Sequence, residues 1–205
     1  VIVEKANKEH PNISKQFQVV ILKTEDPVIL PYLERAIKDP EPDGLLADAC
    51  TDAYIKIQGP KATALLNELV KTRKDLMRSV AFTRLIELRG TAGVTQAVNS
   101  LPLEAEGYAT EGKYTFEKDS AYLCNVIKSE LEKKDVKDIK PVVERMLANK
   151  RWPSQVLAMR CIEMNKWADL KPKIEELKEE KTVVPGWGEE ETTVGQIAEE
   201  IAGAL

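Results

Sequence analysis

The chain has 205 residues, of which 43% are hydrophobic and 31% are charged, and its formal net charge is −4. This length suits one domain or one stack of small repeated units, and this composition can bury a core. The acidic balance argues against nucleic acid as a partner, because neutralising a phosphate backbone requires a dense basic face. No stretch of about 18 apolar residues occurs, so we expect no transmembrane helix.

The chain opens with a polar lead-in, residues 1–12, which contains the only histidine, His10. A catalytic base or a metal ligand needs partners that the fold positions, so we interpret His10 as a solvated side chain. Catalysis by a Ser-His-Asp or Cys-His arrangement is therefore not expected. The first residue is not methionine, which leaves open the removal of an upstream signal peptide.

Six segments place apolar or small residues at i, i+3, i+4 and i+7, the spacing of one helix face. They are 13–22, 45–57, 76–88, 120–131, 154–164 and 194–205. Partner helices are predicted between them, at 28–38, 60–72, 93–101, 138–149 and 168–180. This loose period is typical of helical-pair repeats. Because a lone pair cannot bury its apolar stripe, we expect neighbouring pairs to stack into one continuous core.

Three of the partner helices share the pattern proline, any residue, apolar residue, glutamate, beginning at Pro31, Pro141 and Pro172. With the small-apolar second helices, of which 75–88 is the most typical, this pattern resembles the HEAT and HEAT-like repeats of bacterial proteins. The resemblance runs from about residue 13 to the end of the chain.

The resemblance implies a single all-α domain over 1–205, an α-α superhelix of about five to six antiparallel helix pairs with the first pair incomplete. Such folds usually act as scaffolds that hold a protein partner along an extended surface. We therefore predict a non-catalytic interaction scaffold that presents the ridge of second helices and two long loops to a protein partner, and neither a cofactor nor a metal.

Two alternatives follow from relatives of HEAT-like fold, because a fold alone does not fix a function. One is a nucleic-acid-binding solenoid similar to the HEAT-like alkylpurine DNA glycosylases, which would need a cationic concave face. Its candidate residues are Arg73, Lys74, Arg78, Arg84, Arg89, Arg145, Lys150, Arg151 and Arg160. The other is a HEAT-like lyase or cofactor-binding protein, which would need a polar cluster in a pocket that the sequence does not display.

The three cysteines, Cys50, Cys124 and Cys161, each lie in an apolar helical stretch, and no CxxC pair is present. We interpret them as buried free thiols that fill core space. Free thiols fit a reducing compartment and favour a cytoplasmic location.

Two long connections, 102–118 and 182–192, mix acidic residues with aromatic ones. Long loops in compact domains are often functional, and exposed aromatic rings make good anchors for a partner. The candidate partner-binding residues are Tyr108, Tyr114, Phe116 and Trp187. The alternative is that these rings fold back and cover the ends of the helical stack, which removes a large apolar area from water. The acidic residues of these loops lack calcium-loop spacing, so we interpret them as solvated.

Overall fold

The computed structural model describes residues 18–41, 44–108, 116–185, 187 and 191–205, and within them the fold is all-α apart from one short strand pair. The second helices of successive pairs are α4 (Gly44–Gln58), α6 (Leu76–Arg89), α8 (Phe116–Glu132), α10 (Trp152–Met164) and α12 (Val194–Ala204). The first helices are α3 (Leu30–Ile37), α5 (Thr63–Thr72), α7 (Thr91–Ser100), α9 (Lys140–Leu147) and α11 (Lys171–Glu175). Short 3₁₀ turns are η1 (Pro27–Ile29), η2 (Gly59–Ala62), η3 (Ala105–Gly107) and η4 (Ala168–Leu170).

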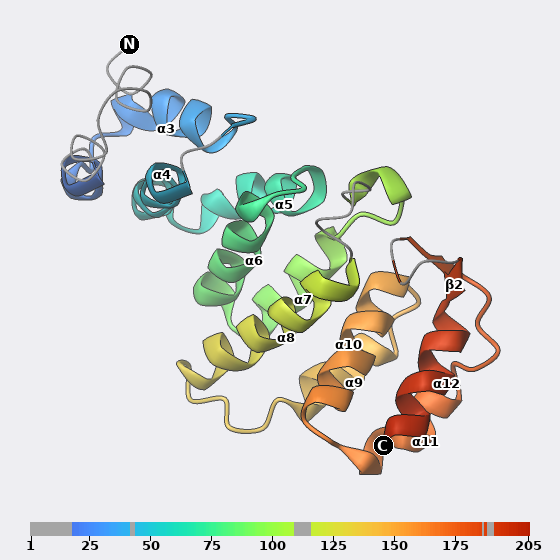
Figure 1. Ribbon diagram of the computed structural model, residues 1–205. Helices are drawn as coiled ribbons and strands as arrows, with labels where there is room; N and C mark the ends of the chain where they lie inside the picture. The colour runs from blue at the N-terminus through green and yellow to red at the C-terminus, as the bar shows by residue number, and fades with distance from the viewer. Residues whose placement is uncertain (1–17, 42–43, 109–115, 186, 188–190) are drawn as a thin grey trace.

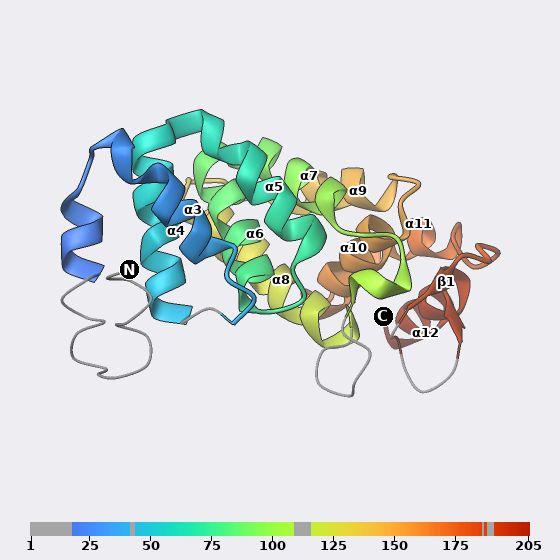
Figure 2. The same cartoon turned by 90° about the horizontal axis from the view of Figure 1, so that it is seen from above.

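The helices form two layers, as the two perpendicular views show (Figure 1, Figure 2). Each second helix packs on the next, in the order α4, α6, α8, α10, α12, and α5, α7 and α9 adjoin one another in the other layer. The packing of consecutive helices is that of a helical superhelix, as the period predicts. A helical segment over residues 18–23 precedes the five pairs of the described chain, at the position of the incomplete first pair.

The middle of the stack departs from simple pairing. Helix α7 packs closely on α6, whereas α8 packs between α6 and α10. The chain between α7 and α8 is the long connection that the sequence analysis singled out, so α8 enters the second layer without a short turn to hold it against α7. This connection therefore has to be fastened by side-chain contacts, and these are described below.

The repeated prolines lie in the first turn of their helices, at the second residue of α3, α9 and α11. Proline is tolerated there because its missing N–H would have no intrahelical acceptor. The structure thus refines the expectation of a proline inside each first helix, since Pro31, Pro141 and Pro172 each mark a helix start.

The last first-layer helix is shorter than predicted. The pattern predicts a helix over 168–180, but α11 ends at Glu175, because in the remainder of that range, 176–180, only Leu177 packs against the core. Helices of this length depend on burial of an apolar face more than on propensity. The chain then forms β1 (Val183–Val184), which pairs antiparallel with β2 (Thr192–Thr193).

The start of α12 is fastened to the end of this segment. The Val194 and Gly195 amides donate to the carbonyls of Thr182 and Glu180, both at 2.9 Å. Thr193 and Gln196 form a reciprocal capping box. A Cβ on Gly195 would lie 2.3 Å from the Lys178 carbonyl oxygen. Glycine at this position therefore permits a close backbone approach.

We predict that Gly195→Ala destabilises the protein by about 1–3 kcal/mol, because the backbone carbonyls beside it cannot move away as a flexible side chain would. Gly203→Ala in the same helix is the matched control, since a Cβ there meets nothing within 4 Å. The control is expected to be neutral or stabilising by up to about 1 kcal/mol through helix propensity. Urea unfolding followed by circular dichroism measures both values. Equal effects of the two substitutions would contradict the close approach.

Candidate functional site

Three aromatic rings form a buried cluster where the long connection meets α8 and α10. The ring centroids of Tyr108, Phe116 and Trp152 lie 5.3, 5.4 and 5.1 Å apart in the pairs Tyr108–Phe116, Tyr108–Trp152 and Phe116–Trp152. Edge-to-face and tilted arrangements at this separation add to the free energy gained by burial alone. Because Phe116 begins α8 and Trp152 begins α10, the cluster joins the first turns of two neighbouring second helices.

Hydrogen bonds to its carbonyl groups hold the segment 101–108 on this cluster. The Tyr108 hydroxyl donates to the Pro102 carbonyl (2.6 Å), and Trp152 Nε1 donates to the Leu103 carbonyl (3.0 Å). Arg151 Nη2 donates to the Leu101 carbonyl at 2.5 Å. Burial raises the pKa of Tyr108, so its hydroxyl stays protonated and can donate. The segment 101–108 is thus held in place by several hydrogen bonds.

Arg78 of α6 also holds this segment. We call Arg78, Arg151 and the three rings together the aromatic anchor. The Arg78 side chain is buried, Nη2 donates to the Gly107 carbonyl, and its guanidinium carbon lies 5.1 Å from the centroid of the Tyr108 ring. Burial lowers the pKa of Arg78, and the charges of Tyr108, Asp119 and Asp75 oppose that change. Burial in turn raises the pKa of the Asp119 carboxyl, against the attraction of Arg78. A buried cation held by carbonyls and a ring face is structural, since it is shielded from any solute.

The structure places three of the four predicted partner-binding residues in the interior. Tyr108, Phe116 and Trp187 are all buried, and Tyr114 lies outside the described residues. The expectation of exposed aromatic anchors is therefore corrected for these three rings, because each covers apolar area of the helical stack. The alternative reading, in which the rings fold back onto the stack, describes their positions. Binding of a partner to these loops stays a prediction.

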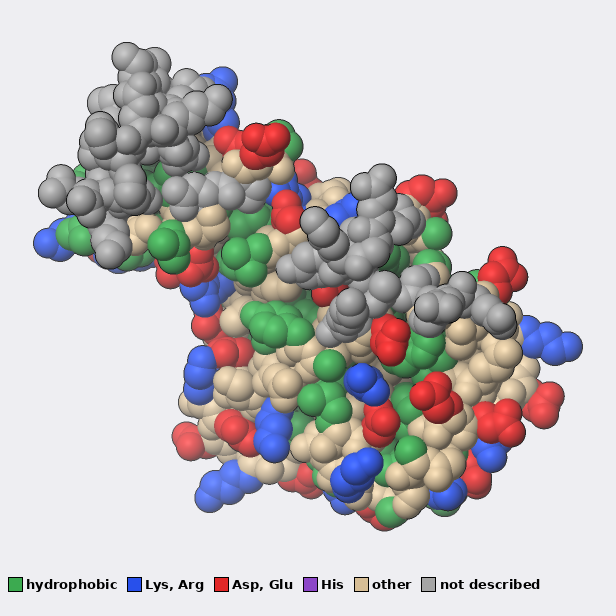
Figure 3. Space-filling view, viewed as in Figure 1, with side chains coloured by type: hydrophobic (Ala, Val, Ile, Leu, Met, Phe, Trp, Pro, Cys, Tyr) green, Lys and Arg blue, Asp and Glu red, His purple; other side chains and the backbone are tan. Residues whose placement is uncertain are grey.

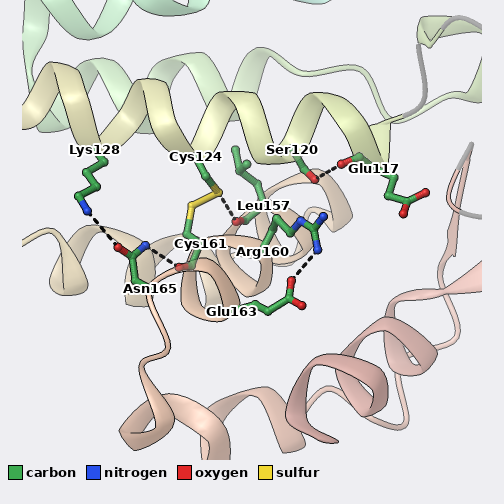
Figure 4. The surroundings of a disulfide bond; sticks show 9 residues. All are labelled: Glu117, Ser120, Cys124, Lys128, Leu157, Arg160, Cys161, Glu163 and Asn165. Atoms are coloured by element: carbon green, nitrogen blue, oxygen red, sulfur yellow. Dashed lines mark hydrogen bonds and ion pairs between the residues drawn. A yellow bond between two sulfur atoms is a disulfide. The ribbon is translucent and has the colours of Figure 1, made fainter. Parts of the chain in front are cut away.

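The interpretation of the cysteines as three free thiols is wrong. Cys124 of α8 and Cys161 of α10 form a disulfide, with their Cα atoms 5.4 Å apart (Figure 4). Cys50 is the free cysteine of the described chain, and burial raises the pKa of its thiol to about 11. The disulfide bridges two successive second helices and closes a sequence separation of 37 residues.

The second layer exposes apolar side chains along the ridge of second helices that the sequence analysis named beside the two loops. We call the outward face of α4, α6 and α8 the ridge. Exposed large apolar side chains occur on each of its helices, namely Leu45, Leu76 and Tyr122. Figure 3 shows hydrophobic side chains at the surface over α6 and α8, among acidic and basic ones.

An ion-pair network crosses the ridge between α4 and α6. Arg84 Nε lies 2.7 Å from Asp52 Oδ1, and Arg84 Nη2 lies 3.0 Å from Asp48 Oδ1. Its third nitrogen, Nη1, lies 3.0 Å from Glu87. Burial lowers the pKa of Arg84, but the three carboxylates outweigh it and raise that pKa above its usual value. One cation thus faces three anions, which leaves this part of the ridge acidic.

Most of the nine basic residues of the nucleic-acid alternative have partners in their own chain. Six pair with carboxylates, carbonyls or an amide oxygen: Arg73, Arg78, Arg84, Arg89, Arg151 and Arg160. The other three, Lys74, Arg145 and Lys150, are exposed but lie outside the ridge. Six of these nine residues are thus engaged in contacts within the chain, and nucleic-acid binding stays an alternative.

No set of three or more His, Cys, Asp and Glu side chains within the described ranges is arranged to hold a metal ion. His10 lies outside these ranges. In the same part of the chain, none of the helices has the length and apolar character needed to cross a bilayer. Comparisons of the chain with family models, with curated proteins and with solved structures found no match.

We predict that Tyr108→Phe destabilises the protein by about 1–2 kcal/mol, because it leaves the buried Pro102 carbonyl without its donor. Tyr122→Phe is the matched control, since the Tyr122 side chain is exposed and the change should stay within about 0.5 kcal/mol. Thermal and urea unfolding of both variants give the comparison. A Tyr108→Phe variant as stable as the control would contradict the anchoring role of this hydroxyl.

Proposed function

We propose that the protein is a non-catalytic scaffold of HEAT-like repeats that binds a protein partner along the ridge of α4, α6 and α8. The observation that carries this proposal is the unequal distribution of exposed apolar side chains between the two layers. Among the described helices, large exposed hydrophobic residues occur on each of α4, α6, α8 and α10 of the second layer, but in the first layer only at its start, at Val28 of η1 and Tyr32 of α3. The helical segment 18–23, which precedes both layers, exposes Val19, Val20 and Leu22 as well.

The chemistry of the ridge suits a protein surface. Apolar groups on three successive helices, Leu45, Leu76 and Tyr122, can be buried by a partner, and tyrosine is enriched among residues that dominate binding energy. The carboxylates around Arg84 favour a partner that carries basic residues beside apolar ones. A surface built from packed helices needs little ordering on binding, so modest contacts can add up to useful affinity.

The buried anchor supports this proposal indirectly. Since the segment 101–108 is held to α6 and α10 by buried groups, the helices beside the ridge keep fixed positions. Of the aromatic residues that the sequence singled out, Tyr108 and Phe116 then serve the surface by holding the start of α8 in place.

We predict that Tyr122→Ala weakens partner binding by about 30-fold, equivalent to about 2 kcal/mol, because a ring at the centre of an interface buries a large area. Tyr32→Ala is the matched control, since Tyr32 is also well exposed, at 64% against 51%, but belongs to the first layer. The partner is captured from native extract at moderate salt, identified by mass spectrometry, purified, and titrated calorimetrically against each variant.

Two results would contradict this proposal. Equal affinities of Tyr122→Ala and Tyr32→Ala for the purified partner would exclude the ridge as the binding surface. Failure to retain any protein in stoichiometric amount would contradict the scaffold itself and favour a nucleic acid or a small molecule.

We predict no measurable binding of duplex DNA even at low salt, about 50 mM, because six of the nine residues of the proposed cationic face are engaged within the chain. Fluorescence anisotropy with a labelled duplex measures this directly. Binding that falls steeply with added salt would support the glycosylase-like alternative instead.

A further inference from the structure

The joint between α8 and α10 is where two parts of the stack meet. Helices up to α8 form one part and α9 to α12 form the other, and the main contacts across the joint are α8 with α10 and α7 with α9 and α10. The chain itself crosses the joint once, through residues 133–139. Any change at this joint alters the angle between the ridge and the C-terminal helices.

Polar contacts across the joint are concentrated at one end of the two helices. Where α8 and α10 begin, Arg151 and Trp152 donate to carbonyls of the segment 101–108, and Asn149 Nδ2 donates to Asn99 Oδ1 at 2.9 Å. Towards the other end of the helices, the polar contact between described side chains is the exposed pair Lys128–Asn165, at 3.5 Å. The joint is thus firmly held at the aromatic end.

The disulfide lies between these two ends (Figure 4). Cys124 is in the third turn of α8, and Cys161 is in the third turn of α10, so the bond closes the joint beyond the aromatic anchor. The disulfide adds a covalent tie of fixed geometry to the apolar packing around it, and so restrains the helices against sliding. Both sulfur-bearing side chains are buried, with exposed fractions of 4% and 1%.

In the reduced state, the Cys124 thiol has a hydrogen-bond acceptor within reach. Cys124 Sγ lies 3.4 Å from the Leu157 carbonyl oxygen of α10, which can accept a weak hydrogen bond from an S–H group. The reduced protein therefore has no charged group in this part of the core, and its helices can stay packed once the bond is broken. The two redox states can share one fold and differ in how firmly the joint is closed.

We propose that the Cys124–Cys161 disulfide is a redox-dependent latch that fixes the α8–α10 joint, and with it the position of the C-terminal helices against α8, the last helix of the ridge. Its consequence for partner binding rests on the proposed function, whereas the latch itself can be tested without a partner. The geometry further points to a chain that acquires this bond where disulfide donors are present, such as an oxidising compartment.

The chemistry is thiol–disulfide exchange. On closing, the two cysteine thiols lose two protons and two electrons, one S–S bond forms, and a disulfide of the donor, such as a thiol oxidoreductase, is reduced to a dithiol. On opening, a dithiol reductant attacks one sulfur and expels the other as a thiolate. Its second thiol then resolves the mixed disulfide. Because the sulfurs are buried, opening of the joint must precede either attack.

The first test counts thiols in the full chain with Ellman's reagent, after equilibration with oxidised dithiothreitol as the disulfide donor. We expect no reactive thiol in the native protein, one after denaturation, which is the buried Cys50, and three after reduction and denaturation. Cys50→Ala is the control and should give none, none and two. Three reactive thiols in the denatured oxidised protein would overturn the latch.

The second test compares amide hydrogen exchange in the oxidised protein, in the protein reduced by dithiothreitol and in the variant Cys124→Ser. We expect the amides of α8 and α10 to exchange about tenfold faster once the bond is absent, with α4 and α6 unchanged. We also expect a melting temperature lower by about 10 °C, from the entropy that a loop of this size gains. The chemically reduced protein keeps the test valid if the variant does not fold.

Either of two patterns would overturn the inference. Identical exchange in the oxidised and reduced proteins would show that the bond does not fix the joint. Equal acceleration in every helix would show a general loss of stability and not a latch at one joint. Neither result bears on whether the ridge binds a partner.

Discussion

Every other feature of this molecule depends on the burial of one apolar stripe per second helix against the next second helix. A helix of 11 to 17 residues, as in α4, α6, α8, α10 and α12, is marginal by itself in water. Its stripe is fully covered only when a first-layer helix and a neighbour in its own layer both pack on it, so no pair is stable alone. Because this packing is repeated along the chain, the core is continuous, and the outward face of the layer is continuous as well.

A stack of this kind is weakest where the regular connection between two helices is replaced by a long one. The connection between α7 and α8 is such a place, and the strongest polar anchoring is found beside it. Buried Arg78 and half-buried Arg151, together with Trp152 and Tyr108, satisfy carbonyls of the segment that crosses the end of the stack. Aromatic rings are well suited to this task because they supply apolar area and a donor in one side chain.

The sequence alone predicts the second helices well, because each carries a stripe of period 3.6 whose partner is of the same kind. The segments at 45–57, 76–88 and 154–164 differ from α4, α6 and α10 by only one or two residues at either end. The short length of α11 could not be predicted from the sequence pattern, since it depends on how much of the core surface α12 leaves for α11 to cover. For the same reason, the inward turn of Tyr108, Phe116 and Trp187 depends on contacts between distant segments.

The sequence indicates only part of what is needed to predict the disulfide. Cys124 and Cys161 occupy successive second helices, which the repeat places side by side, but the register between two parallel helices follows from packing and not from spacing. The ridge has a similar origin, since Leu45, Leu76 and Tyr122 are ordinary members of three amphipathic helices until the layer sets them on one face.

The disulfide can influence the affinity of the ridge for a protein partner. A surface spread over several helices gains from each contact only while the helices hold their alignment, because realignment on binding subtracts from the free energy gained. The aromatic anchor fixes one end of the α8–α10 joint in both redox states. The disulfide fixes the middle of the joint in the oxidised state only. Because α8 belongs to both the ridge and the joint, redox state can change how firmly this helix is held, and so the cost of ordering it on binding, without altering a residue that a partner would touch.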